Sequence, residues 1–285
     1  MIFKKRSLNF KHSFSILSYR FGITQTLLRL VNFLRSPGNT FTILNYHRVN
    51  DFNDPFTIDS VSVKDFKNQM QHISKYYSVF SLEQILARIK DDTGLPKNCL
   101  AVTFDDGYAD NYTFAYPILK KYNLLATIFL TVDCIETQAS LSFDQILSAF
   151  KATGKKRFVC PITETVFDVD SMEKKLHAAH IMLEQLKKQE NAQRKKSIHA
   201  VLKELGIAST EAQDASNLLT WPRIKEMSRH NLTFGSHTMT HPILANLPVS
   251  ELDWELATSR QVIENQIGKA VRLFAYPNGK GRDFN

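Results

Sequence analysis

The stretch LAVTFDDGYAD, residues 100–110, sets two neighbouring carboxylates at the end of an apolar segment. Residues 100–104 have the composition of a buried strand, and Asp105-Asp106-Gly107 ends it abruptly. Adjacent negative charges repel each other, so the pair needs a reason. Taken alone, it is compatible with a turn in which an aspartate caps the following helix. The surrounding segments favour a functional site instead.

Strands and helices alternate on both sides of this stretch. Segments typical of buried strands are FTILNYHRV (41–49), LLATIFLTV (124–132), LTFGSH (232–237) and VRLFAYP (271–277). Helices are predicted at 64–76, at 81–90 with Ser81 at its start, at 114–122, after Trp221-Pro222, and at about 250–267. This alternation predicts an α/β fold built on a parallel sheet or a barrel.

One long region interrupts the alternation. Residues from about 135 to 217 include a polar helical stretch at about 172–205 that is rich in Lys, Glu and Gln. We predict a mainly helical insertion on the surface of the domain, placed where it could serve as a lid. The expected organisation is an N-terminal arm at 1–38 and one domain at 39–285 that contains this insertion.

The charge of the chain is concentrated at its N-terminus. Eight of the 36 basic residues lie in residues 1–50, which contain no Asp or Glu, so the other 28 balance the 28 acidic residues. A neutral body argues against a nucleic-acid partner. No run of about 18 apolar residues predicts a membrane span. The three cysteines have neither metal-ligand nor disulfide spacing, which favours a reducing compartment.

The N-terminal arm has no convincing signal peptide, because polar residues interrupt the segment after Lys4-Lys5-Arg6. Apolar residues recur at helical spacing further along, at Ile23, Leu27, Leu30, Val31 and Leu34. Two interpretations stay open: a helix packed on the domain, or a basic amphipathic helix on an anionic membrane surface. The expected location is the cytoplasm or the periphery of the cytoplasmic membrane.

Polar residues follow four of the predicted strands, at Tyr46-His47, Asp105-Asp106, residues 237–241 and residues 276–279. Each group alone has an ordinary structural explanation, such as a hydrogen-bonded histidine or a capping aspartate. All four fall at the carboxyl end of one predicted sheet, where active sites of α/β folds form. We therefore predict a functional site at that end.

The segment SHTMTH, residues 236–241, suggests a metal site. If the chain turns into a helix after Ser236, His237 and His241 share one face. Two histidines and one carboxylate with an open position form a hydrolytic zinc arrangement. Neighbouring residues of an extended chain point in opposite directions, so one aspartate of the pair can bind the ion while the other acts as a base.

The motifs TFDDG (103–107), HTMTH (237–241) and FAYPNG (274–279) resemble those of the polysaccharide deacetylases with a NodB-homology domain, carbohydrate esterase family 4. The resemblance covers residues 40–134 and 216–285. It implies a distorted (β/α) barrel that hydrolyses N-acetyl groups of amino sugars. It also implies that Asp105 is the catalytic base, that Asp106, His237 and His241 bind the metal, and that Thr238 braces the metal-binding loop.

The segment NYHRV, residues 45–49, is similar to the subgroup that acts on poly-N-acetylglucosamine exopolysaccharide. This resemblance implies that His47 is the general acid. The sequence also departs from the family. Ala275 stands where many relatives have the arginine that steadies the base, and Arg272 is the candidate replacement. The backbone N–H near Asn278 would stabilise the oxyanion, with Tyr276 beside it.

Because the chain ends soon after FAYPNG, we expect a barrel that is incomplete at its C-terminus and a site open to solvent on one side. The expected function is that of a hydrolase of non-peptide carbon–nitrogen bonds, a metal-dependent N-deacetylase of a glycan that contains N-acetylhexosamine. Zinc is the expected ion, with Co²⁺ or Ni²⁺ as alternatives. Two other functions stay open: an O-acetyl esterase using the same site, and a non-catalytic, truncated glycan-binding relative.

Overall fold

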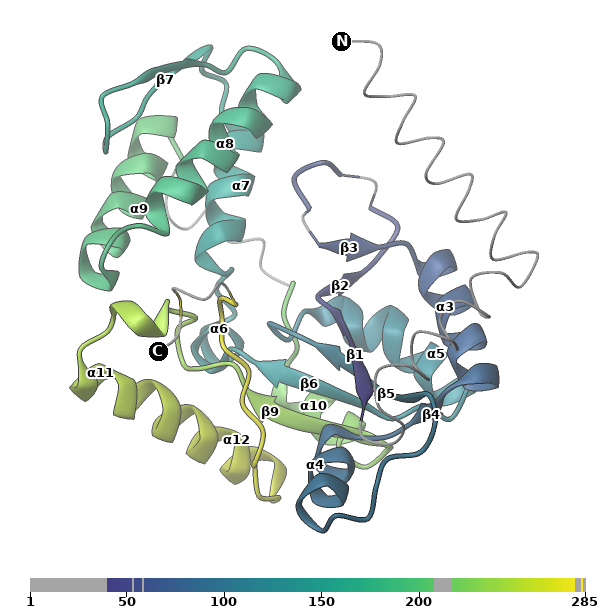
Figure 1. Cartoon of the computed structure of the whole chain (residues 1–285). Helices are drawn as coiled ribbons and strands as arrows, with labels where there is room; N and C mark the ends of the chain where they lie inside the picture. The colour runs from purple at the N-terminus through teal and green to yellow at the C-terminus, as the bar shows by residue number, and fades with distance from the viewer. Residues whose placement is uncertain (1–39, 53, 58, 208–216, 280–282, 284–285) are drawn as a thin grey trace.

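The computed structural model describes residues 40–52, 54–57, 59–207, 217–279 and 283, so the predicted arm at 1–38 lies outside the described residues. Its centre is a parallel sheet in the order β1-β5-β6-β9 (Figure 1). These strands are β1 (Phe41–Tyr46), β5 (Cys99–Phe104), β6 (Ala126–Leu130) and β9 (Leu232–Ser236). The short strand β4 (Ser78–Val79) pairs with the beginning of β5. The predicted α/β fold with a parallel sheet is confirmed.

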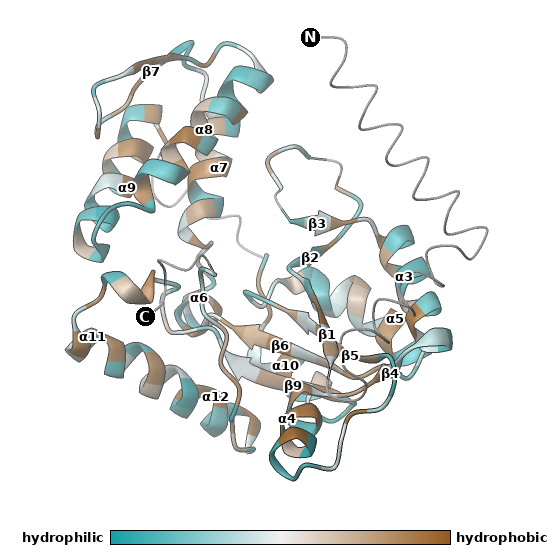
Figure 2. Cartoon of the chain, viewed as in Figure 1, coloured by the Kyte–Doolittle hydropathy of each residue, from teal (hydrophilic) through white to brown (hydrophobic). Residues whose placement is uncertain are grey.

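The central strands are buried because helices cover the sheet. Every residue of β5 and β6 is buried, and both strands are apolar along most of their length (Figure 2). The main hydrophobic cluster joins them to Phe66 and Met70 of α3, Ile224 of α10 and Ile263 of α12. The covering helices are α3 (Val63–Tyr76), α4 (Leu82–Lys90), α5 (Tyr116–Lys121), α10 (Trp221–Met227) and α12 (Ser259–Ile267). The helix start predicted at Ser81 is confirmed, and Ser81 forms a capping box with Gln84.

Shorter elements connect this framework. They are β2 (Arg48–Val49), β3 (Ser60–Val61), α6 (Val132–Thr137), α11 (Val249–Asp253), a 3₁₀ turn (Leu244–Asn246) and two π-helical turns (Asn111–Ala115 and Trp254–Thr258). No helix within the described ranges is long and apolar enough to cross a membrane. Cys99, Cys134 and Cys160 are buried free thiols.

The last predicted strand, at 271–277, is not a regular strand. It forms one parallel bridge, between Ser236 and Phe274, and hydrogen bonds on either side of it. Gly235 permits this close approach, because a Cβ there would lie 2.6 Å from the Phe129 ring and 2.9 Å from the Leu273 carbonyl oxygen. Among the described residues, the strand pairing runs from β1 at one edge to this segment at the other, and no pairing that closes a barrel is detected.

The insertion forms a second hydrophobic cluster of its own, centred on Ile146, Phe158, Met182 and Val201. It consists of α7 (Ser142–Ala152), the hairpin β7 (Arg157–Val159) and β8 (Val166–Asp168), α8 (Met172–Leu186) and α9 (Asn191–Leu205) (Figure 1). The polar stretch predicted at 172–205 is thus two helices. They are separate because their apolar faces pack together and against α7, which requires a turn at residues 187–190. Phe56 joins this cluster from the loop after β2.

Candidate metal centre

The candidate site lies at the carboxyl edge of the sheet. The strands β1, β5 and β9 run parallel, so the residues that follow them reach the same edge. His47 follows β1, Asp105 and Asp106 follow β5, and His237 follows β9. The structure therefore brings the first three of the four predicted strand ends together, and residues 276–279 arrive beside them from the segment that follows α12 and pairs with the end of β9.

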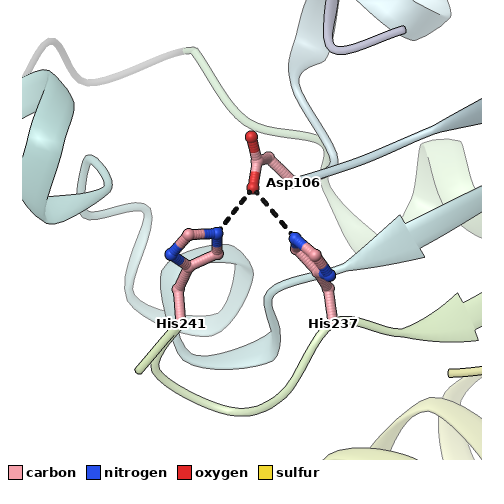
Figure 3. Close-up of side chains that lie close together, drawn as sticks. All are labelled: Asp106, His237 and His241. Atoms are coloured by element: carbon pink, nitrogen blue, oxygen red, sulfur yellow. Dashed lines mark ion pairs between the residues drawn. The ribbon is translucent and has the colours of Figure 1, made fainter. Parts of the chain in front are cut away.

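Asp106, His237 and His241 form a compact group of possible metal ligands (Figure 3). The Oδ1 atom of Asp106 lies 3.5 Å from Nε2 of His237 and 3.3 Å from Nε2 of His241. The side chains of Asp106 and His237 are each only 2% exposed. One carboxylate oxygen and two imidazole nitrogens thus converge at a position with little solvent exposure.

The chemistry of this group fits a divalent cation. Asp106 Oδ1 is buried and has no hydrogen-bond partner, which is costly for a carboxylate unless a cation is nearby. Burial acts to raise the pKa of Asp106, but the contact with His241 and the charges of the neighbouring histidines lower that pKa overall. Burial and the neighbouring His241 lower the pKa of His237. An ionised aspartate beside a neutral imidazole is the protonation state that metal binding requires.

A backbone carbonyl fixes the orientation of His237. Nδ1 of His237 lies 2.9 Å from the carbonyl oxygen of Ala275, and because a carbonyl only accepts, Nδ1 must carry the proton. The lone pair of Nε2 is then free on the side of Asp106. A second partner of this kind is typical of metal-ligating histidines. The irregular segment after α12 thus contributes to the site through its backbone.

The helical turn predicted after Ser236 does not form. His237 and His241 come together through an irregular loop, with ring centroids 5.0 Å apart. Thr238 and His241 have φ angles of 72° and 59°, in the left-handed region that a right-handed helix excludes. The Thr238 hydroxyl accepts a hydrogen bond from the His241 N–H at 3.0 Å and donates one to the His237 carbonyl. Thr238 therefore lies where it can brace the loop, as the family resemblance implies.

The backbone separates the two adjacent aspartates. Asp106 has a φ angle of 73° and Gly107 one of 78°, so the chain turns sharply directly after Asp105. Asp106 faces the two imidazoles, whereas Asp105 Oδ2 accepts a hydrogen bond from Asn45 Nδ2 at 2.7 Å. The structure groups Asp106, and not Asp105, with the histidines. Left-handed residues at such a position are typical of functional sites.

Asn45 is a site residue that the motif pattern does not single out. It lies opposite Thr103 in the pairing of β1 with β5, and the Thr103 hydroxyl donates to Asn45 Oδ1 at 2.8 Å. The available signal is the presence of polar residues at matching positions near the ends of two apolar strands. Arg272, expected to replace the missing arginine, is exposed and lines a hollow with Ser81 and Asn231 at the amino ends of the strands. Arg272 thus lies at the opposite end of the sheet from Asp105, and the structure does not bring it to the base.

A cavity of about 150 Å³ adjoins the group. Its lining from the main domain includes His47, Asp106, Tyr108, His241 and Asn278. The insertion contributes Phe143, Leu183 and Lys187 to the same lining. Nε2 of His47 lies 3.8 Å from Asp105 Oδ2, so the predicted acid and base are neighbours. Tyr276 is 48% exposed and its ring contacts that of Phe274, outside this lining.

A buried polar network links the site to the insertion. Arg48 Nε donates to Asp110 Oδ2 at 2.9 Å, and the Arg48 guanidinium lies 4.5 Å from the centre of the Tyr108 ring. The Tyr108 hydroxyl donates to Asp144 Oδ2 on α7 at 2.8 Å. Burial raises the pKa of Asp144 to about 6. Tyr108 and Asp110, at the end of the stretch LAVTFDDGYAD, therefore connect the site to Arg48 and to the insertion through buried polar contacts.

A parallel α/β domain with an Asp-His-His group at the carboxyl edge of its sheet is a candidate metal-binding domain. The family model described as polysaccharide deacetylase matches residues 92–283. The chain belongs to the polysaccharide deacetylase family.

Curated relatives agree with this assignment. The Bacillus subtilis (strain 168) protein YxkH, whose name assigns it provisionally to the polysaccharide deacetylases, is 25% identical over 240 residues, which are 84% of this chain and 56% of that protein. A Staphylococcus epidermidis poly-β-1,6-N-acetyl-D-glucosamine N-deacetylase is 32% identical over 114 residues, 36% of this chain and 39% of that enzyme. The chain thus matches little more than half the length of the first relative and less of the second.

Solved structures show the same fold. The Streptococcus pyogenes deacetylase PplD in complex with acetate superposes with a TM-score of 0.54 at 20% identity, covering 85% of this chain and 76% of that one. IcaB from Ammonifex degensii gives a TM-score of 0.52 at 18% identity, covering 86% and 78%. The predicted resemblance to NodB-type deacetylase domains is confirmed at the level of fold.

Proposed function

We propose that this chain is a metal-dependent N-deacetylase that removes acetyl groups from N-acetylhexosamine residues of a glycan. The observation that carries the proposal is the convergence of Asp106, His237 and His241 next to a second, separately held carboxylate, Asp105. The poly-β-1,6-N-acetyl-D-glucosamine N-deacetylase among the relatives supports this substrate class. Acetate, present in the PplD complex, is the product that such a reaction releases.

Asp106, His237 and His241 would hold the ion, and their ligand set suits zinc, with cobalt or nickel as alternatives. A bound divalent ion supplies Lewis-acid polarisation of the acetyl carbonyl and makes water a better nucleophile at neutral pH. The chain itself supplies the low exposure of Asp106 and His237, which keeps competing water away. It also supplies the left-handed backbone that aims both imidazoles at one carboxylate oxygen.

Asp105 acts as the general base in this proposal. It accepts a proton from the water whose oxygen attacks the acetyl carbonyl carbon. The Asn45 amide holds one oxygen of Asp105, and the Thr103 hydroxyl in turn orients Asn45. This bond restricts the Asp105 carboxylate, because its rotation would break the contact with Asn45.

His47 acts as the general acid. Breaking the carbon–nitrogen bond requires a proton on the departing nitrogen. His47 lines the cavity and lies 3.8 Å from Asp105. The backbone N–H near Asn278 would stabilise negative charge that develops on the carbonyl oxygen. The balanced reaction consumes one water and one N-acetyl group and yields acetate and a free amine.

The proposal is tested by acetate release from N-acetylglucosamine oligomers, with metal content measured in parallel. The wild-type chain should bind one divalent ion and release acetate. The His237→Ala/His241→Ala double variant should lose most of the metal and the activity. Asp105→Asn should keep the metal and lose about 10²- to 10⁴-fold in rate, as expected for a general base.

Three results would contradict the proposal. Full metal occupancy in the double histidine variant would show that His237 and His241 are not the metal ligands. A wild-type chain that holds metal and binds oligomers without releasing acetate would be a glycan-binding relative. Release of acetate from O-acetylated sugars alone would instead identify an esterase.

A further inference from the structure

The loop of residues 237–241 carries both histidines, yet it has no regular secondary structure to satisfy its backbone N–H groups. The His237 N–H donates to the Leu130 carbonyl at 2.9 Å. The N–H groups of Thr238 and His241 donate to nearby side-chain oxygens, of Ser236 at 3.1 Å and of Thr238 at 3.0 Å. The two remaining N–H groups, those of Met239 and Thr240, lie between the two histidines.

Both of these N–H groups donate to the same side chain. Oε2 of Glu255 accepts from the Met239 N–H at 2.8 Å and from the Thr240 N–H at 2.9 Å. Oε1 of Glu255 accepts from the Thr240 hydroxyl at 2.5 Å. A single carboxylate thus holds the middle of the loop with both of its oxygens.

Glu255 is only 2% exposed, and a buried carboxylate is unfavourable unless polar groups compensate for its lost hydration. The hydrogen bonds that the described residues donate to it all come from Met239 and Thr240. The Arg194 guanidinium on α9 acts on it electrostatically. A buried carboxyl side chain whose hydrogen-bond donors among the described residues all belong to this loop is placed to shape the loop.

The element that carries Glu255 is adapted to this contact. Glu255 lies in the π-helical turn Trp254–Thr258, an irregularity that often occurs at functional sites. Ser259 follows at the start of α12, and its hydroxyl lies 2.6 Å from the hydroxyl of Ser236. Ser236 in turn accepts from the Thr238 N–H. The same short stretch of chain therefore supports the beginning of the loop as well as its middle.

The opposite side of the loop rests on α6. The carbonyl groups of Thr238 and Met239 accept hydrogen bonds from the N–H groups of Val132 and Asp133 at 3.2 and 2.9 Å. These hydrogen bonds hold the backbone of Thr238 and Met239 against the start of α6. They do not reach Thr240 or His241, so the path to the second histidine depends on Glu255 and Thr238.

We propose that Glu255 is the positioning residue that sets the distance between His237 and His241, and so the metal affinity of the site. The inference rests on the metal site of the proposed function. Thr238 and His241 hold unfavourable left-handed φ angles, which persist only if the surrounding contacts enforce them. Without the carboxylate, the chain between the histidines can relax and move His241 away from Asp106.

The experiment measures Zn²⁺ affinity by competition with a chelator, and the visible spectrum of the Co²⁺-loaded protein, both without substrate. Glu255→Ala should weaken Zn²⁺ binding about 10- to 100-fold and shift the Co²⁺ spectrum, as expected for loss of a group that orients ligands. Glu255→Gln, which keeps one acceptor oxygen for the two N–H groups, should recover part of the affinity. The matched control is Glu251→Ala, an exposed glutamate on α11, which should bind Zn²⁺ like the wild type.

Urea unfolding in the presence of a chelator separates a loss of positioning from a loss of folding. A folded Glu255→Ala protein with wild-type Zn²⁺ affinity and Co²⁺ spectrum would overturn the inference. If Glu255→Ala fails to fold, Thr240→Val removes only the hydroxyl bond and should weaken Zn²⁺ several-fold. Wild-type affinity in both Thr240→Val and Glu255→Gln would then refute it. A wild-type chain that binds no ion would refute the metal site itself, whereas metal binding without acetate release would leave this inference standing and refute only the proposed reaction.

Discussion

Asp105 and Asp106 are covalent neighbours whose carboxylates face different partners. Asp106 lies among imidazoles and is almost inaccessible, whereas Asp105 is 13% exposed at its side chain and bonded to an amide. That the two carboxylates face different partners was predicted from the opposite directions of adjacent side chains, although the structure separates them by a left-handed turn at Asp106. Which of the two faces the histidines could not be read from the spacing, because it depends on the left-handed φ of Asp106.

His47 provides a test of acid catalysis at the level of one residue. His47→Ala should retain the metal and slow amide hydrolysis strongly, because the amine leaves poorly without a proton. Hydrolysis of an activated acetyl ester should fall much less, because its leaving group needs no proton. Rates on both substrates, with metal content as a control, check this prediction. Equal losses on the two substrates would mean that His47 acts in another way.

Asn45 provides a test of how the base is held. Asn45→Ala removes a hydrogen bond to a charged group, an interaction worth about 1.5–3 kcal/mol. We expect kcat/KM for deacetylation to fall about 10- to 100-fold at unchanged metal content. Thr42→Ala, at an exposed position on the same strand, is the control. An Asn45→Ala protein as active as this control would show that Asp105 needs no support from β1.

At the level of elements, the apolar periodicity predicted most strands and helices because burial in a parallel sheet requires it. The pattern failed at two places where backbone geometry decides. Spacing of four between His237 and His241 suggested a helix, but the left-handed φ angles of Thr238 and His241 exclude one. Residues 271–277 have the composition of a strand, yet they pair with β9 only around Phe274.

Gly235 tests the contact between β9 and that last segment. Gly235→Ala places a methyl group 2.6 Å from the Phe129 ring and 2.9 Å from the Leu273 carbonyl oxygen. We expect a loss of about 1–3 kcal/mol in the free energy of unfolding, typical of overpacking. Metal binding should weaken too, because the Ala275 carbonyl that orients His237 belongs to the displaced segment.

The matched control for this change is Gly154→Ala, where an added Cβ meets no atom within 4 Å. Urea unfolding and chelator competition of the two variants provide the comparison. If the two proteins unfold at the same urea concentration and bind metal equally, the close packing at Gly235 does not support the site.

At the level of the whole molecule, the main domain and the insertion both line the cavity beside the site. The insertion contributes Phe143, whose ring centre lies 5.8 Å from that of His241, and Asp144, which accepts from Tyr108. Phe56 and the Asp54–Lys151 ion pair tie the insertion to the loop after β2. A surface insertion was predictable from its polar composition, but its contribution to the cavity wall was not, because nothing local marks Leu183 or Lys187 as facing Asp106.

Asp144 makes this junction sensitive to pH. Burial raises its pKa from 3.8 to about 6, so between about pH 4 and 6 the folded chain keeps a proton that the unfolded chain has lost. The free energy of unfolding contributed by this group therefore falls as pH rises through that interval. Asp144→Asn carries no such proton and should gain stability relative to the wild type, by at most about 3 kcal/mol at pH 7.

The measurement is urea unfolding at a series of pH values with a chelator present, so that bound metal does not change the charge near Asp106. Asp133→Asn, which alters an exposed carboxyl on α6, is the control. A difference between Asp144→Asn and the wild type that stays constant from pH 4 to 7 would contradict the burial of an ionisable carboxyl at this junction.

The position of the site across two strands that are not neighbours has a consequence for folding kinetics. Asp106 follows β5 and His237 follows β9, and β6 lies between these strands in the sheet. The group is therefore assembled only after both pairings of β6 have formed. Contacts between residues so distant along the chain form late, since the intervening loops must close first. Capture of a metal ion by a refolding chain would then proceed at the rate of sheet completion, and its time course would report the final step of folding.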